Sequence, residues 1–330
     1  GYSSSGEVIE VGEGITNFRV GDRVACAGAD IANHAEVVAI PENLAVIIPD
    51  QVSLKDAAYT TIASIAMQGV RQADLRLGES CAVIGLGLLG QLTVQILKSS
   101  GVKVAGIDIN PEMVKLAKKS GADLVFMRGD GKEDQSISNM SDGFGVDSVI
   151  ITAATASLDP IEFAGRLCRP KGKVIVVGAV PTGFSRDIYY KKELEVRMAT
   201  SYGPGRYDSF YEEEGNDYPV GFVRWTEQRN FEAVLDMMSS GSLNVKSLIT
   251  HRYDIDNAIE AYKLLNDSAA LGILINYHNE DPNILIRSKV ELNKTNNIVD
   301  GSSMPCIGFI GAGNYASRIL IPSFKKAGAI

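Results

Sequence analysis

A glycine-rich turn between an apolar strand and a helix is the feature that most constrains this chain. Gly85-Leu86-Gly87-Leu88-Leu89-Gly90 follows the apolar residues 81–84 and opens a helix predicted over residues 88–100. In this pattern the first glycine permits the tight turn, the second lets backbone approach a pyrophosphate, and the third lets the helix pack on the strand. The helix N-terminus adds partial positive charge. Five residues are therefore predicted to contact a dinucleotide: Gly85, Gly87, Leu88, Leu89 and Gly90.

An acidic residue follows at the spacing that a dinucleotide site requires. Asp108 lies 18 positions after Gly90, at the end of a strand predicted over residues 102–107. A carboxylate there can accept a hydrogen bond from the adenosine ribose, worth ~1.5–3 kcal/mol, and would repel a 2′-phosphate. Asp108 therefore predicts NAD as the cofactor, although Lys115 and Arg128 are nearby cations that could meet a phosphate.

Strands and helices alternate from residue 80 onward. Helices are predicted over residues 59–72, 88–100 and 111–120, and strands over 81–84, 102–107, 123–126, 148–152, 173–177 and 193–199. Such alternation is typical of an α/β fold with a doubly wound parallel sheet, a Rossmann domain. The first 57 residues differ, since short β-rich runs over 7–11, 23–27 and 35–40 around a Gly21-Asp22 turn indicate part of a small β-barrel.

The composition of the chain changes after the last predicted strand of the sheet. Residues 201–230 are aromatic and charged, and two amphipathic helices over 231–239 and 255–266 precede a strand over 272–277. Residues 278–303 are polar and resemble a linker, in which 284–286 could form a short strand. The expected organisation is a barrel domain over 1–57, a Rossmann domain over 58–200, a return to the barrel domain over 201–277, a linker over 278–303 and an incomplete second Rossmann unit over 304–330. Because both ends fall inside expected domains, we expect a fragment of a longer protein.

The composition disfavours several classes of partner. The formal charge of −8 and the pI near 5.1 argue against nucleic acid, whose binders concentrate Lys and Arg on one face. Four scattered cysteines without a C-x-x-C pair indicate neither a disulfide framework nor a structural zinc lobe, and favour a reducing, cytoplasmic compartment. No apolar run approaches the roughly 20 residues of a membrane span. The expected partner is a small molecule.

With the Gly21-Asp22-Arg23-Val24 turn and the glycine fingerprint in hand, residues 1–277 resemble the medium-chain dehydrogenase/reductase family. That resemblance implies a GroES-like catalytic domain interrupted by a Rossmann domain, and commonly a homo-oligomer. Residues 304–330, with Gly311, Gly313 and Ala316, look like the start of a Gfo/Idh/MocA-type oxidoreductase. The combination resembles bi-domain oxidoreductases of polysaccharide biosynthesis.

The chain departs from the family at the positions where zinc-dependent members carry their metal ligands. Those members have Gly-His-Glu where this chain reads Gly1-Tyr2-Ser3, and a further ligand where it has Thr60. Tyr, Ser and Thr are not normal zinc ligands, so no metal is expected. Without zinc a side chain must handle the hydroxyl proton, and Tyr2 and Thr60 are the catalytic candidates, although a core aromatic and a helix N-terminal hydroxyl are the plainer interpretations.

The resemblance also implies residues for the nicotinamide and the substrate. The nicotinamide and its ribose would be bordered by residues that follow the predicted strands: Ala153, Val177, Gly178, Ala179, Thr200 and Tyr202. Guanidinium groups bind carboxylates and phosphates and aromatic rings stack on sugars, which makes the 201–230 segment a candidate substrate pocket. Its proposed members are Arg206, Tyr207, Arg224, Trp225 and Arg229, with a solvated loop as the alternative.

These observations favour a zinc-independent oxidoreductase that transfers a hydride between NAD(H) and an alcohol or sugar, in polysaccharide or nucleotide-sugar metabolism. One alternative is a catalytically silent nucleotide-binding module that docks or regulates the fused domain, and another is a quinone or enone reductase. His34 is expected in a strand in a structural role, Cys168 at the end of a helix, and the Glu212-Glu213-Glu214 run on a solvated face.

Overall fold

The computed structural model describes residues 1–267, 269–278 and 307–329. The chain divides into two compact units, Gly1–Ile286 and Arg287–Ile330. The first unit contains all of the described strands, and the second contains a glycine loop and short helices over its described residues. None of the described helices is long and apolar enough to span a bilayer.

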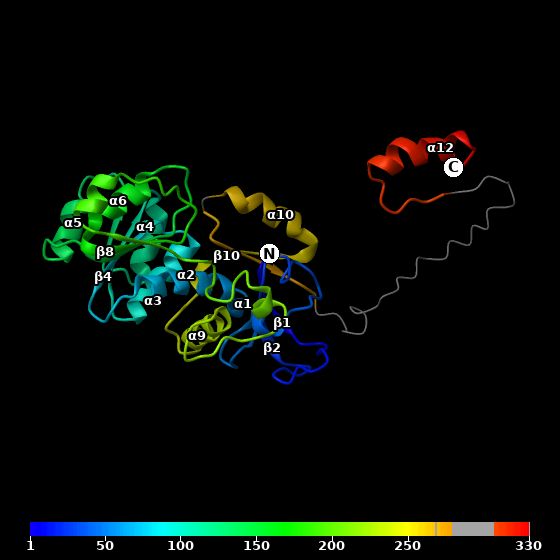
Figure 1. Cartoon of the computed structure of the whole chain (residues 1–330), viewed down its shortest axis with the longest axis horizontal. Coiled ribbons are helices and arrows are strands. Elements are labelled where there is room, and N and C mark those ends of the chain that lie inside the picture. Colours follow the sequence, from blue (N-terminus) through cyan, green and yellow to red (C-terminus); the bar gives the residue numbers. More distant parts are fainter. Residues whose placement is uncertain (268, 279–306, 330) are drawn as a thin grey trace. The chain divides into compact units, whose positions relative to one another are not determined.

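The first unit is organised around a parallel sheet of six strands (Figure 1). Its strands lie in the order β6-β5-β4-β7-β8-β9, which confirms the predicted doubly wound fold. Their bounds are β4 (Ser80–Ile84), β5 (Lys103–Asp108), β6 (Leu124–Met127), β7 (Val146–Ile151), β8 (Cys168–Val176) and β9 (Glu195–Met198).

Helices cover both faces of this sheet because alternate strand residues point to opposite sides. In β4, Cys81 and Val83 pack with α2, α3 and α4, whereas Ala82 and Ile84 pack with α5, α6 and α7. The helices span α2 (Thr60–Ala73), α3 (Leu88–Ser99), α4 (Pro111–Lys119), α5 (Glu133–Met140), α6 (Asp159–Leu167) and α7 (Arg186–Lys191). Burial on both faces explains why these strands are continuous apolar runs.

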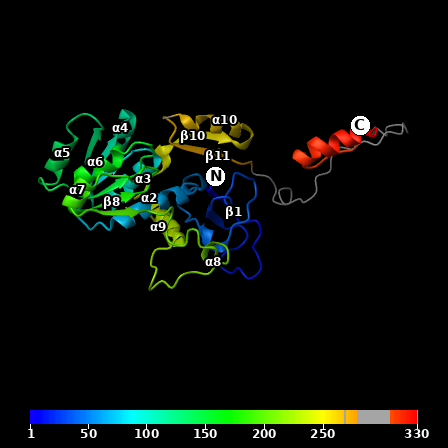
Figure 2. The ribbon, with the colours of Figure 1, turned by 45° about the horizontal axis from the view of Figure 1, so that its top comes forward.

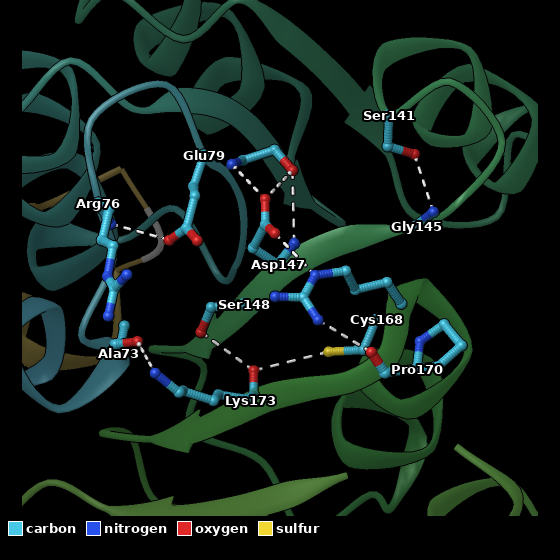
Figure 3. A network of polar contacts seen from close by, with 12 residues as sticks. Ala73, Arg76, Glu79, Ser141, Gly145, Asp147, Ser148, Cys168, Pro170 and Lys173 are labelled. Atoms are coloured by element: carbon cyan, nitrogen blue, oxygen red, sulfur yellow. Dashed lines mark hydrogen bonds and ion pairs between the residues drawn. The ribbon is translucent and has the colours of Figure 1, made fainter. Parts of the chain in front are cut away.

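A polar network ties together the strands at the amino end of the sheet (Figure 3). Asp147 in β7 accepts hydrogen bonds from the Ser80 backbone N–H at 2.8 Å and the Ser80 hydroxyl at 2.9 Å, and from Arg169 Nε at 2.7 Å. Burial raises the pKa of Asp147, but the hydrogen bonds from Arg169 and Ser80 outweigh it and hold that pKa below its ordinary value. The network joins β4, β7 and β8 at the amino ends of these strands, whereas the glycine turn lies at the carboxyl end of β4.

The remainder of the first unit comes from both ends of its sequence. Residues before α2 form an antiparallel sheet in the order β1-β2-β3, and the later residues form the parallel pair β10–β11, with α10 against it (Figure 2). The bounds are β1 (Ser3–Glu7), β2 (Arg23–Ala27), η1 (Glu42–Leu44), β3 (Ala45–Ile47), α1 (Leu54–Ala57), α8 (Ser209–Glu212), α9 (Glu227–Ser239), η2 (Lys246–Leu248), β10 (Ile249–Asp254), η3 (Ile255–Asn257), α10 (Ala258–Lys263), η4 (Leu264–Asn266) and β11 (Gly272–Asn276).

A shared core joins the two ends. Phe231 and Leu235 on α9 are buried against Leu44 and Val46, and Tyr202 belongs to the same cluster. The segment after β9 therefore returns to pack on the first 57 residues, as the family resemblance implies.

Three sequence-based expectations for this unit are wrong. The first strand is Ser3–Glu7 rather than residues 7–11, and residues 35–40 form no strand, because they have no ladder partner and only Ile40 packs into the apolar clusters. Finally, α9 begins four residues before the predicted start, because the Thr226 hydroxyl accepts a hydrogen bond from the Arg229 N–H and caps it. Cys168, by contrast, caps the C-terminus of α6 as predicted, and it also begins β8.

The described part of the second unit is a glycine loop followed by the helical segments η5 (Ala316–Leu320) and α12 (Ile321–Lys326). The linker expected over 278–303 and the short strand at 284–286 lie outside the described residues, apart from His278.

Candidate active site

The candidate site lies at the carboxyl end of the parallel strands, where the strand order reverses. β4 lies between β5 and β7, and the chain leaves β4 for α3 on one face and β7 for α6 on the other. Such a switch point leaves a crevice beyond the strand ends, which is the general ligand-binding place of doubly wound sheets. The glycine turn follows β4 directly.

Each glycine of the turn has the geometry expected of its position. Gly85 has φ +94°, and a methyl group built on it would lie 2.5 Å from the Ala153 backbone nitrogen. A methyl on Gly90 would lie 2.0 Å from the Gly85 carbonyl oxygen, so that only glycine lets the first turn of α3 approach the loop. A methyl on Gly87 would meet nothing within 4 Å, which leaves its surface open to a ligand.

The first turn of α3 faces this open position. Gly87 precedes the helix, and Leu88, Leu89 and Gly90 are its first three residues. Backbone N–H groups in a first helical turn lack intrahelical partners and favour an anion. The loop thus forms a cradle that fits the pyrophosphate of a dinucleotide.

Asp108 connects the glycine turn to the next strand. It ends β5, and its carboxylate accepts the Leu86 N–H at 2.5 Å and the Asn110 N–H at 2.8 Å. A carboxylate can accept about four hydrogen bonds, so capacity remains for a ribose hydroxyl. The geometry is compatible with the predicted role.

Lys115 and Arg128 are the two cations that could favour a 2′-phosphate, and their side chains have different surroundings. Arg128 is engaged by Asp159 at 2.7 Å and Glu133 at 3.1 Å, and its guanidinium lies over the Phe163 ring. Lys115 is exposed on α4 and lines a hollow that also includes Ser247, Thr250, Ala269 and Leu271. The Arg128 backbone N–H donates a 2.8 Å hydrogen bond to the Asp108 carbonyl, so Arg128 lies next to Asp108, but its guanidinium is paired with Asp159 and Glu133.

The residues expected around the nicotinamide follow β7, β8 and β9. A methyl on Gly178 would lie 2.1 Å from the Ala153 carbonyl oxygen, so these two segments cross in contact, and the Ala179 carbonyl accepts the Thr155 N–H. Val177 lies against Gly69 of α2, and Thr200 follows β9. These positions offer backbone rather than side-chain chemistry.

Tyr202 departs from that pattern because its ring is part of the core. It is 2% exposed, its ring centre lies 5.5 Å from that of Phe231, and burial raises the pKa of its hydroxyl. Only its backbone could border a cofactor, and its carbonyl accepts a hydrogen bond from Asn230.

No hydrogen bond within the described residues joins the catalytic candidates Tyr2 and Thr60. The Tyr2 side chain is 42% exposed, so it is not a core aromatic, and partial burial raises the pKa of its hydroxyl. Thr60 is the first residue of α2 and is buried, but its hydroxyl does not cap the helix and has no hydrogen-bond partner in the described parts of the chain. Ser3 ties the two segments together through a 2.6 Å bond from its hydroxyl to the Ala58 carbonyl.

The five proposed substrate residues fall into two groups. Arg206 forms an ion pair of 2.7 Å with Glu212, and Arg229 pairs with Asp217, so both guanidinium groups stabilise the 201–230 segment. The other three are more accessible: Tyr207, which is 74% exposed, Arg224, which is exposed, and Trp225, which is partly exposed. The expectation of a solvated face for the acidic run is wrong at Glu212, which Arg206 pulls into the interior, while Glu213 and Glu214 are exposed.

The sequence-based reasoning missed a buried polar cluster beside Arg206. Glu227 is 0% exposed, and neither of its carboxyl oxygens has a hydrogen-bond partner among the residues that the structure describes. Burial, with a smaller effect of Glu212, raises the pKa of Glu227 to about 9. This carboxyl is therefore neutral at pH 7, and no described residue forms a hydrogen bond with the nearby Tyr202 hydroxyl.

The three histidines lie apart from one another. His34 is in no strand; its Nδ1 lies 2.8 Å from the Tyr262 hydroxyl, and partial burial lowers its pKa. His251 contacts Thr250, and His278 contacts Asp256. Within residues 1–267, 269–278 and 307–329, no three His, Cys, Asp or Glu side chains are grouped so that they could hold a metal ion.

Comparison with known proteins agrees with this geometry. Residues 89–214 match the family described as zinc-binding dehydrogenase. A D-guloside 3-dehydrogenase of Escherichia coli (strain K12) is 28% identical over 258 residues, which cover 78% of this chain and 70% of the relative. A sorbitol dehydrogenase of Halalkalibacterium halodurans is 26% identical, with 83% of this chain and 82% of the relative covered. These relatives are dehydrogenases of the medium-chain type, and they support an enzyme of that class.

A solved structure shows the same fold. The alcohol dehydrogenase TADH from Thermus sp. ATN1 has a TM-score of 0.69 and 23% identity, with 84% of each chain covered. The family match begins at residue 89 and therefore excludes Tyr2 and Thr60, so it carries no information about the zinc-ligand positions.

In the second unit, Gly311 has φ +85° and the helical segment follows Gly313. Ala316 is buried at the start of η5. This local arrangement is compatible with a glycine turn that opens a helix.

Proposed function

We propose that this chain is an NAD-dependent, zinc-independent dehydrogenase that acts on an alcohol or sugar. The observation that carries the proposal is the glycine cradle: Gly90 and Gly85 bring helix and loop into contact, while Gly87 stays open beside Asp108. Bound NAD would supply the hydride acceptor or donor, and the chain would bind and orient it. Gly85, Gly87, Leu88, Leu89, Gly90 and Asp108 would hold its pyrophosphate and ribose.

NAD is favoured over NADP by the charges around the cradle. Asp108 would repel a 2′-phosphate, and Arg128 is neutralised by Asp159 and Glu133. The hydroxyls of Tyr2 and Thr60 do not form a zinc donor set, which supports zinc independence. In place of zinc, the Tyr2 hydroxyl would hold or release the proton of the substrate hydroxyl. Because burial raises the pKa of Tyr2, a group on the substrate or the cofactor would have to stabilise the deprotonated tyrosine.

Sugar substrates are supported by two lines. The relatives named above are named for D-guloside and sorbitol, and the exposed Tyr207 offers an aromatic ring of the kind on which sugar rings stack. Trp225 belongs to the same segment, but Arg71 and Arg224 stack on its ring. A role in polysaccharide or nucleotide-sugar metabolism, and a second oxidoreductase unit that begins in residues 304–330, are parts of the same proposal.

The test is to titrate the full chain with NADH and, separately, with NADPH, and to measure binding from the fluorescence of the nucleotide. We expect tighter binding of NADH and loss of that preference in Asp108→Ala. Asp123→Ala is the matched control, because Asp123 also accepts a backbone N–H, from Val104 at 2.7 Å, but precedes β6 at the amino end of the strands, whereas Asp108 lies at the carboxyl end of β5. If the wild-type chain binds neither nucleotide, the dehydrogenase proposal fails and a silent docking module takes its place.

A further inference from the structure

Two arginines from distant parts of the sequence stack on one tryptophan. The guanidinium carbon of Arg71 lies 3.4 Å from the Trp225 ring centre, and that of Arg224 lies 3.9 Å from it. Arg71 is in the last turns of α2, whereas Arg224 and Trp225 immediately precede α9. The site formed by these three residues, here the Arg–Trp–Arg site, lies where these helices meet.

Contacts within the chain hold Arg71 in place. Its Nε donates a 2.8 Å hydrogen bond to Asn230 Oδ1 on α9, and its Nη2 lies 3.3 Å from the Met67 sulfur. Asn230 is fully buried and is itself fixed through a 2.9 Å bond to the Tyr202 carbonyl. The guanidinium is therefore preorganised rather than free to rotate.

Within the described part of the chain, neither Arg71 nor Arg224 forms an ion pair with a carboxylate. Among the described residues, every ion pair of an arginine involves Arg128, Arg169, Arg197, Arg206 or Arg229, and none involves Arg71 or Arg224. Burial and the nearby Arg224 charge lower the pKa of Arg71 to about 10, and no acid acts in the opposite direction. The acid within electrostatic reach of Arg224 is Glu232, which forms no ion pair with it.

We propose that the Arg–Trp–Arg site binds the phosphate group of a small-molecule ligand. The tryptophan face offsets part of the repulsion between the two cations, but a dianion would remove it and could use the N–H groups that the stacking leaves free. Two uncompensated charges favour a phosphate over a singly charged carboxylate. The proposal stands apart from hydride transfer, because it concerns the binding of an anion and not the reaction at the glycine cradle.

The sequence offers a direct reporter, since Trp225 is the single tryptophan of the chain. The experiment is to titrate the full chain with inorganic phosphate at constant ionic strength and to measure the fluorescence of Trp225 at each step. The same titration with acetate shows how the site responds to a singly charged carboxylate. We expect a saturable change with phosphate and a weaker response to acetate. In Arg224→Gln the apparent Kd should rise about tenfold or more, as the loss of a charge-assisted contact predicts.

Arg224→Gln should fold, because Arg224 is exposed and forms no hydrogen bond or ion pair with other described residues. Arg71→Gln should also lose the response. The matched control is Arg186→Gln, which removes the same charge from an exposed guanidinium stacked on Tyr190 at 3.8 Å. No saturable response, an equal response to acetate, or an Arg224→Gln variant that responds like the wild type would each overturn the proposal, whether or not NADH binds.

Discussion

The buried Glu227 carboxyl should make the stability of this protein fall as pH rises. Its folded-state pKa is raised by burial to about 9, whereas a carboxyl of this type in an unfolded chain titrates near 4.5. Between these values the folded state holds a proton that the unfolded state has released. The contribution is complete below about pH 4.5 and is lost progressively as pH rises towards 9.

The expected change in the free energy of unfolding follows from this difference in proton binding between the folded and unfolded states. A single group that is protonated only in the folded state changes the free energy of unfolding by about 1.4 kcal/mol for each pH unit. Glu227→Gln keeps the size and the neutral form of the side chain but cannot ionise. Relative to the wild type, the variant should gain about 1.4 kcal/mol between pH 7 and pH 8.

The measurement is urea unfolding of both proteins at pH 6, 7, 8 and 9. Glu214→Gln is the control, because Glu214 is exposed and the chemical change is the same. The difference between Glu227→Gln and the wild type should grow with pH, while Glu214→Gln should run parallel to the wild type. Parallel profiles for all three proteins would refute a neutral, buried Glu227.

Further predictions concern the cradle, the sheet edge and the catalytic candidate. Gly90→Ala should weaken NADH binding about tenfold or more and lower the melting temperature, because its methyl would lie 2.0 Å from the Gly85 carbonyl oxygen. Gly87→Ala should weaken NADH binding without lowering the melting temperature, because, apart from its chain neighbours, no atom of the described residues lies within 4 Å of the added methyl. Equal losses of stability in the two variants would contradict these assignments. Asp147→Ala should reduce the free energy of unfolding by about 2 kcal/mol in a denaturant titration, because it leaves the Ser80 N–H and the partly exposed Arg169 guanidinium without their acceptor. The affinity for NADH should not change. Tyr2→Phe should reduce turnover by more than tenfold once a substrate is known, and a smaller loss would remove Tyr2 from the mechanism.

The Rossmann part was predictable because local pattern and tertiary burial agree there. Its strands are buried on both faces and alternate with amphipathic helices, so apolar periodicity locates them to within a few residues. The glycine fingerprint also specified its own geometry, down to the open space at Gly87 and the close packing at Gly90. The sequence therefore predicted the glycine turn as well as the fold around it.

The substrate side was less predictable because its contacts join residues far apart in the sequence. Nothing local to Arg71 indicates that it stacks on Trp225, 154 positions later. The burial of Glu227 and Glu212 was hidden for the same reason, since acidic residues are normally solvated and only the return of the 201–230 segment encloses these two. Local periodicity contains no information about such enclosures.

The core shared by the two ends of the first unit has a consequence for synthesis on the ribosome. Leu44 and Val46 are covered by Phe231 and Leu235, which are translated almost two hundred residues later. At about 5–20 residues per second, the apolar surface of the first strands waits on the order of ten seconds or more for its partner. During that interval the nascent chain can pair β1, β2 and β3 and can complete the parallel sheet, but the first sheet still lacks the α9 residues that cover it. Residues 1–57 are therefore exposed in that period to chaperones and to misassembly between neighbouring chains.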